Sequence, residues 1–107
     1  MCGFSFGSRV GLEVGIHDPR VAFLIGIGAP LGKYDFSFLS SCRKPLLLVH
    51  GEHDEFGDVD RLRKLVAELE TSVPVRLVVV PGAEHFFEGH LDELKRAITE
   101  WITEQLA

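Results

Sequence analysis

The chain has 107 residues, of which 46% are hydrophobic and 25% charged, with a formal net charge of −5. This composition predicts a single globular domain over residues 1–107, with one hydrophobic core. The acidic balance argues against nucleic acid binding, because no basic stripe is present to neutralise phosphates. No apolar run approaches the roughly 20 residues that cross a bilayer, and no secretory signal follows Met1, so we expect a cytoplasmic protein without membrane contacts.

Two cysteines, Cys2 and Cys42, are too few for a disulfide framework. We expect both to be free thiols, and a Cys2–Cys42 disulfide is the alternative. Nothing in the sequence predicts a bound cofactor.

The first functional pattern is Gly3-Phe4-Ser5-Phe6-Gly7, which fits the G-x-S-x-G pattern of a nucleophile elbow. In that motif a serine occupies a tight turn between a strand and a helix, and the glycines keep Cβ atoms out of the crowded bend. The turn would expose the Ser5 hydroxyl and direct the Phe6 backbone N–H toward a developing oxyanion. A glycine-rich loop with an incidental serine is the alternative interpretation.

The next elements are a helix and a buried strand. We expect the helix over Phe6 to Ile16, where three glycines recur every four residues along one face: Gly7, Gly11 and Gly15. Because glycine in a helix costs about 1 kcal/mol relative to alanine, this face is expected to approach a sheet closely. Val21 to Ile27 is an unbroken apolar run, which is typical of a strand buried on both faces.

Two later apolar runs each end in a turn that carries a polar side chain. Leu46 to His50 precedes the turn with Asp54, and Val75 to Val80 precedes the turn with His85. Parallel strands end at one edge of a sheet, and open α/β sheets place their active sites there. We therefore expect Asp54 and His85 to lie near Ser5.

Amphipathic patterns predict two further helices. Asp58 is placed to cap a helix that ends near Glu70, and the last helix covers about Leu91 to Leu106, with Trp101 as a core anchor. The alternation of strands and helices predicts an α/β fold with about three parallel strands.

The order Ser5, Asp54, His85 is the order of a catalytic triad on an α/β-hydrolase scaffold. The sequence also closely resembles small bacterial α/β-hydrolases of the esterase or dienelactone-hydrolase-like type, and three stretches carry the resemblance: Tyr34 to Leu39, Lys44 to Gly57 and Pro81 to His90. The resemblance covers essentially all 107 residues but corresponds to only the second half of a typical family member. It implies a truncated α/β-hydrolase fold.

The resemblance implies a serine hydrolase for small acyl esters, in which Ser5 attacks the substrate, His85 moves the proton and Asp54 orients His85. Gly28 to Lys44 is too short for the cap domain that such enzymes can insert there, so we expect an open site. Six aromatic residues are expected to line the substrate pocket: Phe4, Phe36, Phe38, Phe56, Phe86 and Phe87. For Phe36 and Phe38 the alternative is packing on a neighbouring strand.

Other polar residues near Asp54 suggest alternatives. His50 and His53 have the Glu52 carboxylate between them and Asp54 directly after, a combination that zinc uses, but His-x-x-His spacing suits a helix and no second ligand pair follows. We therefore expect no metal site. His50 is expected to be a satisfied structural group, and three carboxylates are expected to be solvated: Glu52, Asp58 and Glu84.

The departures from the family lead to two further expectations. A complete member has strands before the elbow and draws a second oxyanion N–H from a loop among them. We expect the strand entering the elbow to be absent here, so that Val21 to Ile27 presents a bare edge through which two chains pair as a homodimer. The alternative function is a weak or inactive half-domain that needs a partner chain.

Overall fold

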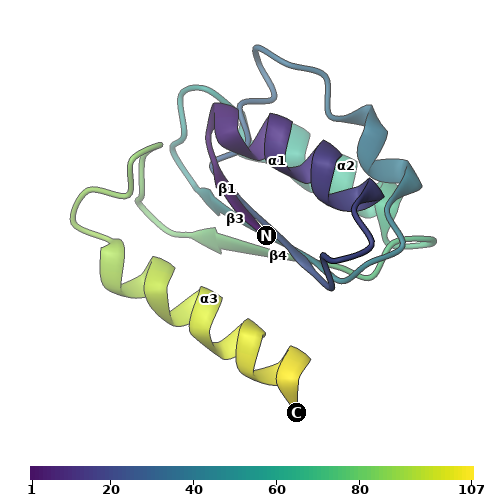
Figure 1. The fold of residues 1–107 in the computed structure, drawn as a ribbon. Helices are drawn as coiled ribbons and strands as arrows, with labels where there is room; N and C mark the ends of the chain where they lie inside the picture. Colours follow the sequence, from purple (N-terminus) through teal and green to yellow (C-terminus); the bar gives the residue numbers. More distant parts are fainter.

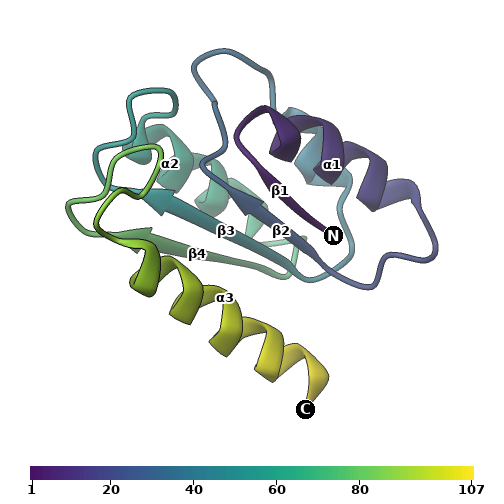
Figure 2. The ribbon, with the colours of Figure 1, turned by 60° about the vertical axis from the view of Figure 1, so that its left-hand side comes forward.

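The computed structural model describes all 107 residues and contains four strands and three α-helices (Figure 1). The strands form one parallel sheet in the order β1-β2-β3-β4. Helices α1 and α2 cover one face of the sheet and α3 covers the other (Figures 1 and 2). The expected α/β class is confirmed. The elements are β1 (Cys2–Phe4), α1 (Phe6–His17), β2 (Leu24–Ile27), a 3-10 helix (Ser37–Ser41), β3 (Leu46–Gly51), α2 (Val59–Leu69), β4 (Val75–Val80) and α3 (Leu91–Leu106).

The two central strands, β2 and β3, form from the predicted apolar runs, and every residue in both is buried. β2 begins at Leu24, three residues later than predicted. Successive side chains point to opposite faces of the sheet, so these strands supply two cores. One core lies under α1 and α2 and includes Leu24, Leu46 and Leu48. The other lies under α3 and includes Ile25 and Leu47, as well as the predicted anchor Trp101, which packs edge-on against Phe23.

The sheet differs from the prediction at its amino-terminal edge. Cys2–Phe4 forms a short strand that pairs in parallel with β2, so the sheet has four strands and the strand entering the elbow is present. The Ile25 N–H donates to the Met1 carbonyl and the Ser5 N–H donates to the Ile27 carbonyl, both at 2.8 Å. The prediction of a bare edge at Val21 to Ile27 is therefore wrong, because β1 covers β2 and the free edge belongs to β1.

The helix predictions agree closely with the structure. Asp58 caps α2, since its Oδ2 accepts from the Arg61 N–H at 3.3 Å. At Gly15 an added Cβ would lie 2.4 Å from Leu24 Cδ2, which confirms a close approach of α1 to the sheet. At Gly7 an added Cβ would meet nothing within 4 Å, so the predicted contact does not extend to the start of the helix.

Both cysteines are free thiols, with Cys42 buried and Cys2 exposed, so the alternative disulfide is not formed. No helix combines the length and the apolar character that crossing a membrane requires.

Candidate active site

Ser5 lies between β1 and α1 in a backbone conformation that side chains rarely adopt, with φ 55° and ψ −123°. Such strain persists only where the surroundings enforce it, and it is common at functional sites. Here the Ser5 N–H is tied to the Ile27 carbonyl, while the Ser5 carbonyl accepts from Ser8 N at 2.9 Å and from Ser8 Oγ at 2.5 Å. Ser8 is fully buried, and its role in holding the turn was not predicted from the sequence.

Glycine is required at position 3 because the backbone of β1 passes very close to the first turn of α1. A Cβ at Gly3 would lie 2.6 Å from the Gly7 carbonyl oxygen and 2.8 Å from Ser8 Cα, both of which are backbone atoms. Gly7 contributes its carbonyl to this crowding, but its own Cβ position faces open space. The expectation that both glycines clear the bend therefore holds for Gly3 and is wrong for Gly7.

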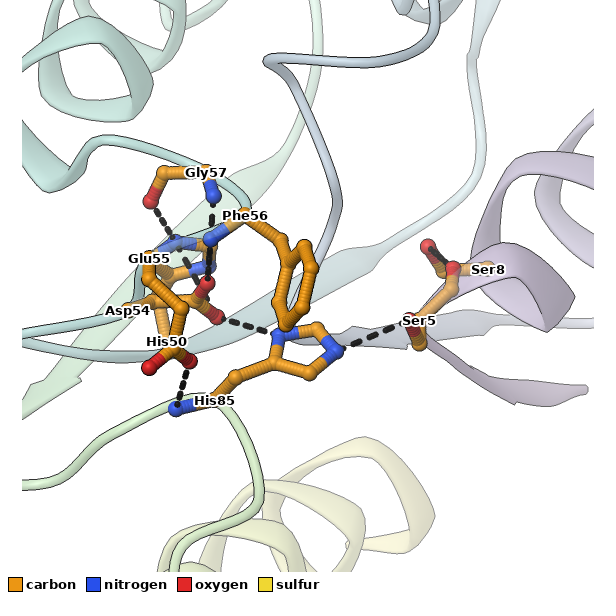
Figure 3. Close-up of polar contacts among 8 residues, drawn as sticks. All are labelled: Ser5, Ser8, His50, Asp54, Glu55, Phe56, Gly57 and His85. Atoms are coloured by element: carbon orange, nitrogen blue, oxygen red, sulfur yellow. Dashed lines mark hydrogen bonds and ion pairs between the residues drawn. The ribbon is translucent and has the colours of Figure 1, made fainter.

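Ser5, His85 and Asp54 form a continuous hydrogen-bonded row (Figure 3). Ser5 Oγ lies 2.8 Å from His85 Nε2, and His85 Nδ1 lies 2.7 Å from Asp54 Oδ2. An ionised carboxylate only accepts hydrogen bonds, so Nδ1 carries the proton and Nε2 is free to accept from the serine hydroxyl. His85 and Asp54 are only 2% and 7% exposed, so the inner part of the row is shielded from water.

Backbone amides hold the Asp54 carboxylate in place. Its Oδ1 accepts from the Phe56 N–H at 2.7 Å and from the Gly57 N–H at 3.1 Å, which leaves Oδ2 for His85. The neighbouring Glu55 accepts from the His85 backbone N–H at 3.3 Å. These contacts arise from loop conformation, and no sequence pattern indicated them.

The turns that follow β3 and β4 are also fastened to each other. His53 N–H donates to the Ala83 carbonyl at 2.9 Å, and Gly82 N–H donates to Glu52 Oε1 at 2.9 Å. Glu52 is exposed, as expected for a solvated charge, and it also accepts this hydrogen bond. Together these bonds fix the separation between the turn with Asp54 and the turn with His85.

His50 lies behind Asp54, and only one of its two ring nitrogens has a hydrogen-bond partner, so the expectation of a fully satisfied group is only partly met. Its Nε2 is 2.5 Å from the Gly57 carbonyl, but its Nδ1 is buried without a hydrogen-bond partner. His53 is instead exposed beside Glu52, so the two histidines of the alternative zinc site face different surroundings. Nowhere do three histidine, cysteine, aspartate or glutamate side chains converge as metal ligands.

An open hollow of about 170 Å³ lies beside Ser5. Two of the predicted pocket residues line it, Phe56 and Phe86, and their rings lie 4.6 and 4.9 Å from the His85 ring. The Phe4 ring also flanks His85, at 5.4 Å. The remaining lining residues were not predicted as pocket side chains: Phe6, Pro30, Lys33 and Tyr34.

Three of the six predicted pocket residues face elsewhere. Phe36 is buried in the core under α1 and α2, and Phe38 packs against it beneath the Arg9 guanidinium. Phe87 is fully buried in the core under α3, although its neighbour Phe86 is 67% exposed. These placements correct the prediction, and for Phe36 and Phe38 they match the alternative of simple packing.

Phe6 is the first residue of α1. The N–H groups of a first helical turn have no carbonyl partner within the helix, and they form its electropositive end. The Phe6 N–H is therefore a suitable candidate for an oxyanion donor next to Ser5.

No family model matches the chain. An uncharacterised protein of Rickettsia prowazekii, RP471, is 29% identical over 106 residues, which are 94% of this chain and 44% of that protein. A protein of unknown function from Agrobacterium tumefaciens, described as a candidate α/β-hydrolase, superposes with a TM-score of 0.91 at 30% identity, over 98% of this chain and 49% of that one.

Two solved structures that are described as serine hydrolases are also similar to this chain. An α/β serine hydrolase homologue from Coxiella burnetii is 36% identical with a TM-score of 0.78, over 99% of this chain and 48% of that one. A lidless α/β serine hydrolase from Xanthomonas campestris is 30% identical with a TM-score of 0.81, over 97% of this chain and 46% of that one. The chain thus spans about half the length of the proteins that it matches. Its fold is similar to about half of these α/β-hydrolases, which is consistent with a partial α/β-hydrolase.

Proposed function

We propose that this chain is the nucleophile-bearing half of a serine hydrolase that cleaves small acyl esters. The observation that carries the proposal is the unbroken row from Ser5 Oγ through His85 to Asp54, with hydrogen bonds of 2.8 and 2.7 Å. A serine, a histidine and a carboxylate in this order of contact are the parts that nucleophilic acyl transfer uses.

In the proposed reaction Ser5 Oγ attacks the acyl carbon while His85 Nε2 takes the hydroxyl proton. His85 then gives this proton to the departing alcohol, which leaves an acyl group on Ser5. Water repeats the two steps and releases the acid. Asp54 holds the Nδ1–H tautomer and stabilises the imidazolium that forms at each step.

The surroundings of Ser5 favour small, apolar acyl groups. The hollow beside the serine is open and has aromatic walls, among them Phe56 and Phe86. The Phe6 N–H is the proposed oxyanion donor. An oxyanion hole that lacks one of its donors typically loses a factor of about 10²–10³ in rate. We therefore expect slow turnover from a chain that supplies this donor alone.

The second candidate function is a weak or inactive half-domain that needs a partner chain. The observation that favours it is the match to only about half the length of similar hydrolases. A hydrogen-bonded row like this one can persist in a chain that needs a partner to complete its site.

The deciding experiment compares p-nitrophenyl acetate hydrolysis by the wild type and by Ser5→Ala, alongside fluorophosphonate labelling of both. The substitution removes only the hydroxyl, so the folded state should be retained, which circular dichroism checks. Turnover and labelling in the wild type alone would support the serine hydrolase. Equal background rates and no labelling would favour the half-domain.

A further inference from the structure

His50 is a buried, titratable side chain that the proposed reaction does not use. It lies near the end of β3, with no exposed surface, beside Asp54 (Figure 3). Its Nδ1 has no hydrogen-bond partner. An unpaired buried nitrogen lowers stability, and an apolar side chain of similar size would avoid that loss. Packing alone therefore does not account for a histidine at this position.

The one hydrogen bond of His50 connects it through Gly57 to the Asp54 carboxylate. The Gly57 carbonyl can only accept, so Nε2 carries the proton and donates to it at 2.5 Å. The N–H of the same glycine donates to Asp54 Oδ1 at 3.1 Å. Gly57 is thus held from both sides, by the imidazole through its carbonyl and by the carboxylate through its amide.

The packing around Gly57 leaves little freedom for this link to shift. A Cβ at Gly57 would lie 2.3 Å from the Ala29 carbonyl oxygen and 3.2 Å from His50 Nε2. His50 Nε2 is also 3.7 Å from Asp54 Oδ2, too far to compete with His85 for that oxygen. The imidazole therefore influences the carboxylate through Gly57.

We infer that His50 is a positioning residue: its Nε2–H anchors Gly57 so that the Gly57 amide holds Asp54 Oδ1 and turns Oδ2 toward His85. This inference rests on the proposed function for its effect on rate. Loss of the anchor would loosen the Asp54–His85 bond without touching the substrate hollow. Small displacements of catalytic groups cost up to about 10²-fold in rate, so kcat should fall about 10- to 100-fold with KM unchanged.

Three substitutions separate positioning from packing. His50→Gln places an amide N–H near the position of Nε2 and keeps a donor. His50→Asn is too short to reach Gly57. His50→Leu fills the space, removes the donor and also removes the unpaired Nδ1. If the inference is right, the glutamine variant is the most wild-type-like in rate. The leucine variant is slow although it melts close to the wild type, because removal of the unpaired Nδ1 offsets the loss of the donor to the buried Gly57 carbonyl.

A proton NMR measurement makes the test independent of turnover. The proton between His85 Nδ1 and Asp54 should give a low-field resonance, assigned by its loss in His85→Gln. We expect this resonance to be kept in His50→Gln and to be shifted or broadened in His50→Leu and His50→Asn. An unchanged resonance in the leucine and asparagine variants would overturn the inference, whether or not the protein hydrolyses esters.

The other outcomes also decide. If all three variants lose stability and the resonance in parallel, His50 is a packing residue and the inference is wrong. If the leucine variant does not fold, the glutamine and asparagine pair gives the answer. If the wild type is inactive but the resonance responds as expected, the proposed function fails and the positioning role stands.

Discussion

The close approach of β1 to the start of α1 provides a test of the elbow, because alanine at Gly3 and alanine at Gly7 should change the free energy of unfolding in opposite directions. Gly3→Ala would place a methyl group 2.6 Å from the Gly7 carbonyl oxygen and 2.8 Å from Ser8 Cα. Both are backbone atoms that cannot rotate away. Gly7→Ala would place a methyl group where no atom lies within 4 Å.

The expected free energies of unfolding follow from these contacts. Overpacking typically costs about 1–3 kcal/mol, and we expect Gly3→Ala at the upper end because the backbone itself must move. Gly7→Ala should stabilise the protein by about 0.5–1 kcal/mol, since alanine is the better helix former in α1. For a domain near this size about 1 kcal/mol shifts the melting temperature by roughly 4–8 °C, so a difference of about 3.5–4 kcal/mol between the two variants corresponds to about 14–32 °C.

Thermal unfolding at low protein concentration, followed by circular dichroism, measures the difference. Fluorophosphonate labelling of Ser5 adds a local measurement: where the wild type labels, Gly3→Ala should lose labelling because the serine turn is displaced, and Gly7→Ala should keep it. Equal melting temperatures for the two variants, or a more stable Gly3→Ala, would refute the reasoning from this close approach.

Two further predictions concern the surface near β1. We propose that the free β1 edge and the exposed face of α1 (Phe6, Val10 and Val14) pair with a second copy of the chain. Light scattering should then show a dimer at micromolar concentration that Val10→Glu, but not Leu106→Glu on α3, converts to a monomer, and a monomeric wild type would contradict the pairing. Desolvation raises the pKa of the Cys2 thiol, and the N-terminal ammonium partly offsets this shift. The folded state therefore disfavours the Cys2 thiolate. Ionisation of Cys2 should then lower the stability of the folded state as the pH rises above about 9. Alkylation of Cys2, resolved by mass spectrometry, should reach half its maximal rate at a higher pH in folded than in urea-unfolded protein, and equal midpoints would exclude the effect.

The elements with strong periodicity could be predicted from the sequence to within a residue or two at most ends. The run Leu46 to His50 became β3 with one added residue, and the helix expected to end near Glu70 ends at Leu69. β1 could not be predicted, because Cys2–Phe4 is too short to show alternation. It is a strand because its backbone pairs with β2, which is a tertiary contact.

The juxtaposition of Ser5, Asp54 and His85 was predictable from their order along the chain and because Asp54 and His85 each follow a predicted strand at one edge of a parallel sheet. The aromatic pocket was only half predictable, since hydrophobicity does not tell which way a loop side chain points. Adjacent residues illustrate this: Phe86 faces the hollow and Phe87, with φ 56°, turns into the core. The amide contacts that hold Asp54 depend on loop conformation and left no signal in residue type.

The proposed acyl transfer has two requirements that one activity measurement can distinguish. Proton movement depends on the row from Ser5 to Asp54, whereas charge stabilisation depends on the donors around the oxyanion, of which Phe6 N–H is the one proposed here. Loss of one oxyanion donor costs about 10²–10³ in rate, while loss of the nucleophile or base in a serine hydrolase costs about 10⁶. A chain with a working row and one donor should therefore still exceed Ser5→Ala by a wide margin. A wild-type rate equal to that of Ser5→Ala would then be too large a loss for the lack of one oxyanion donor, and it would favour the half-domain that needs a partner chain for more than this donor.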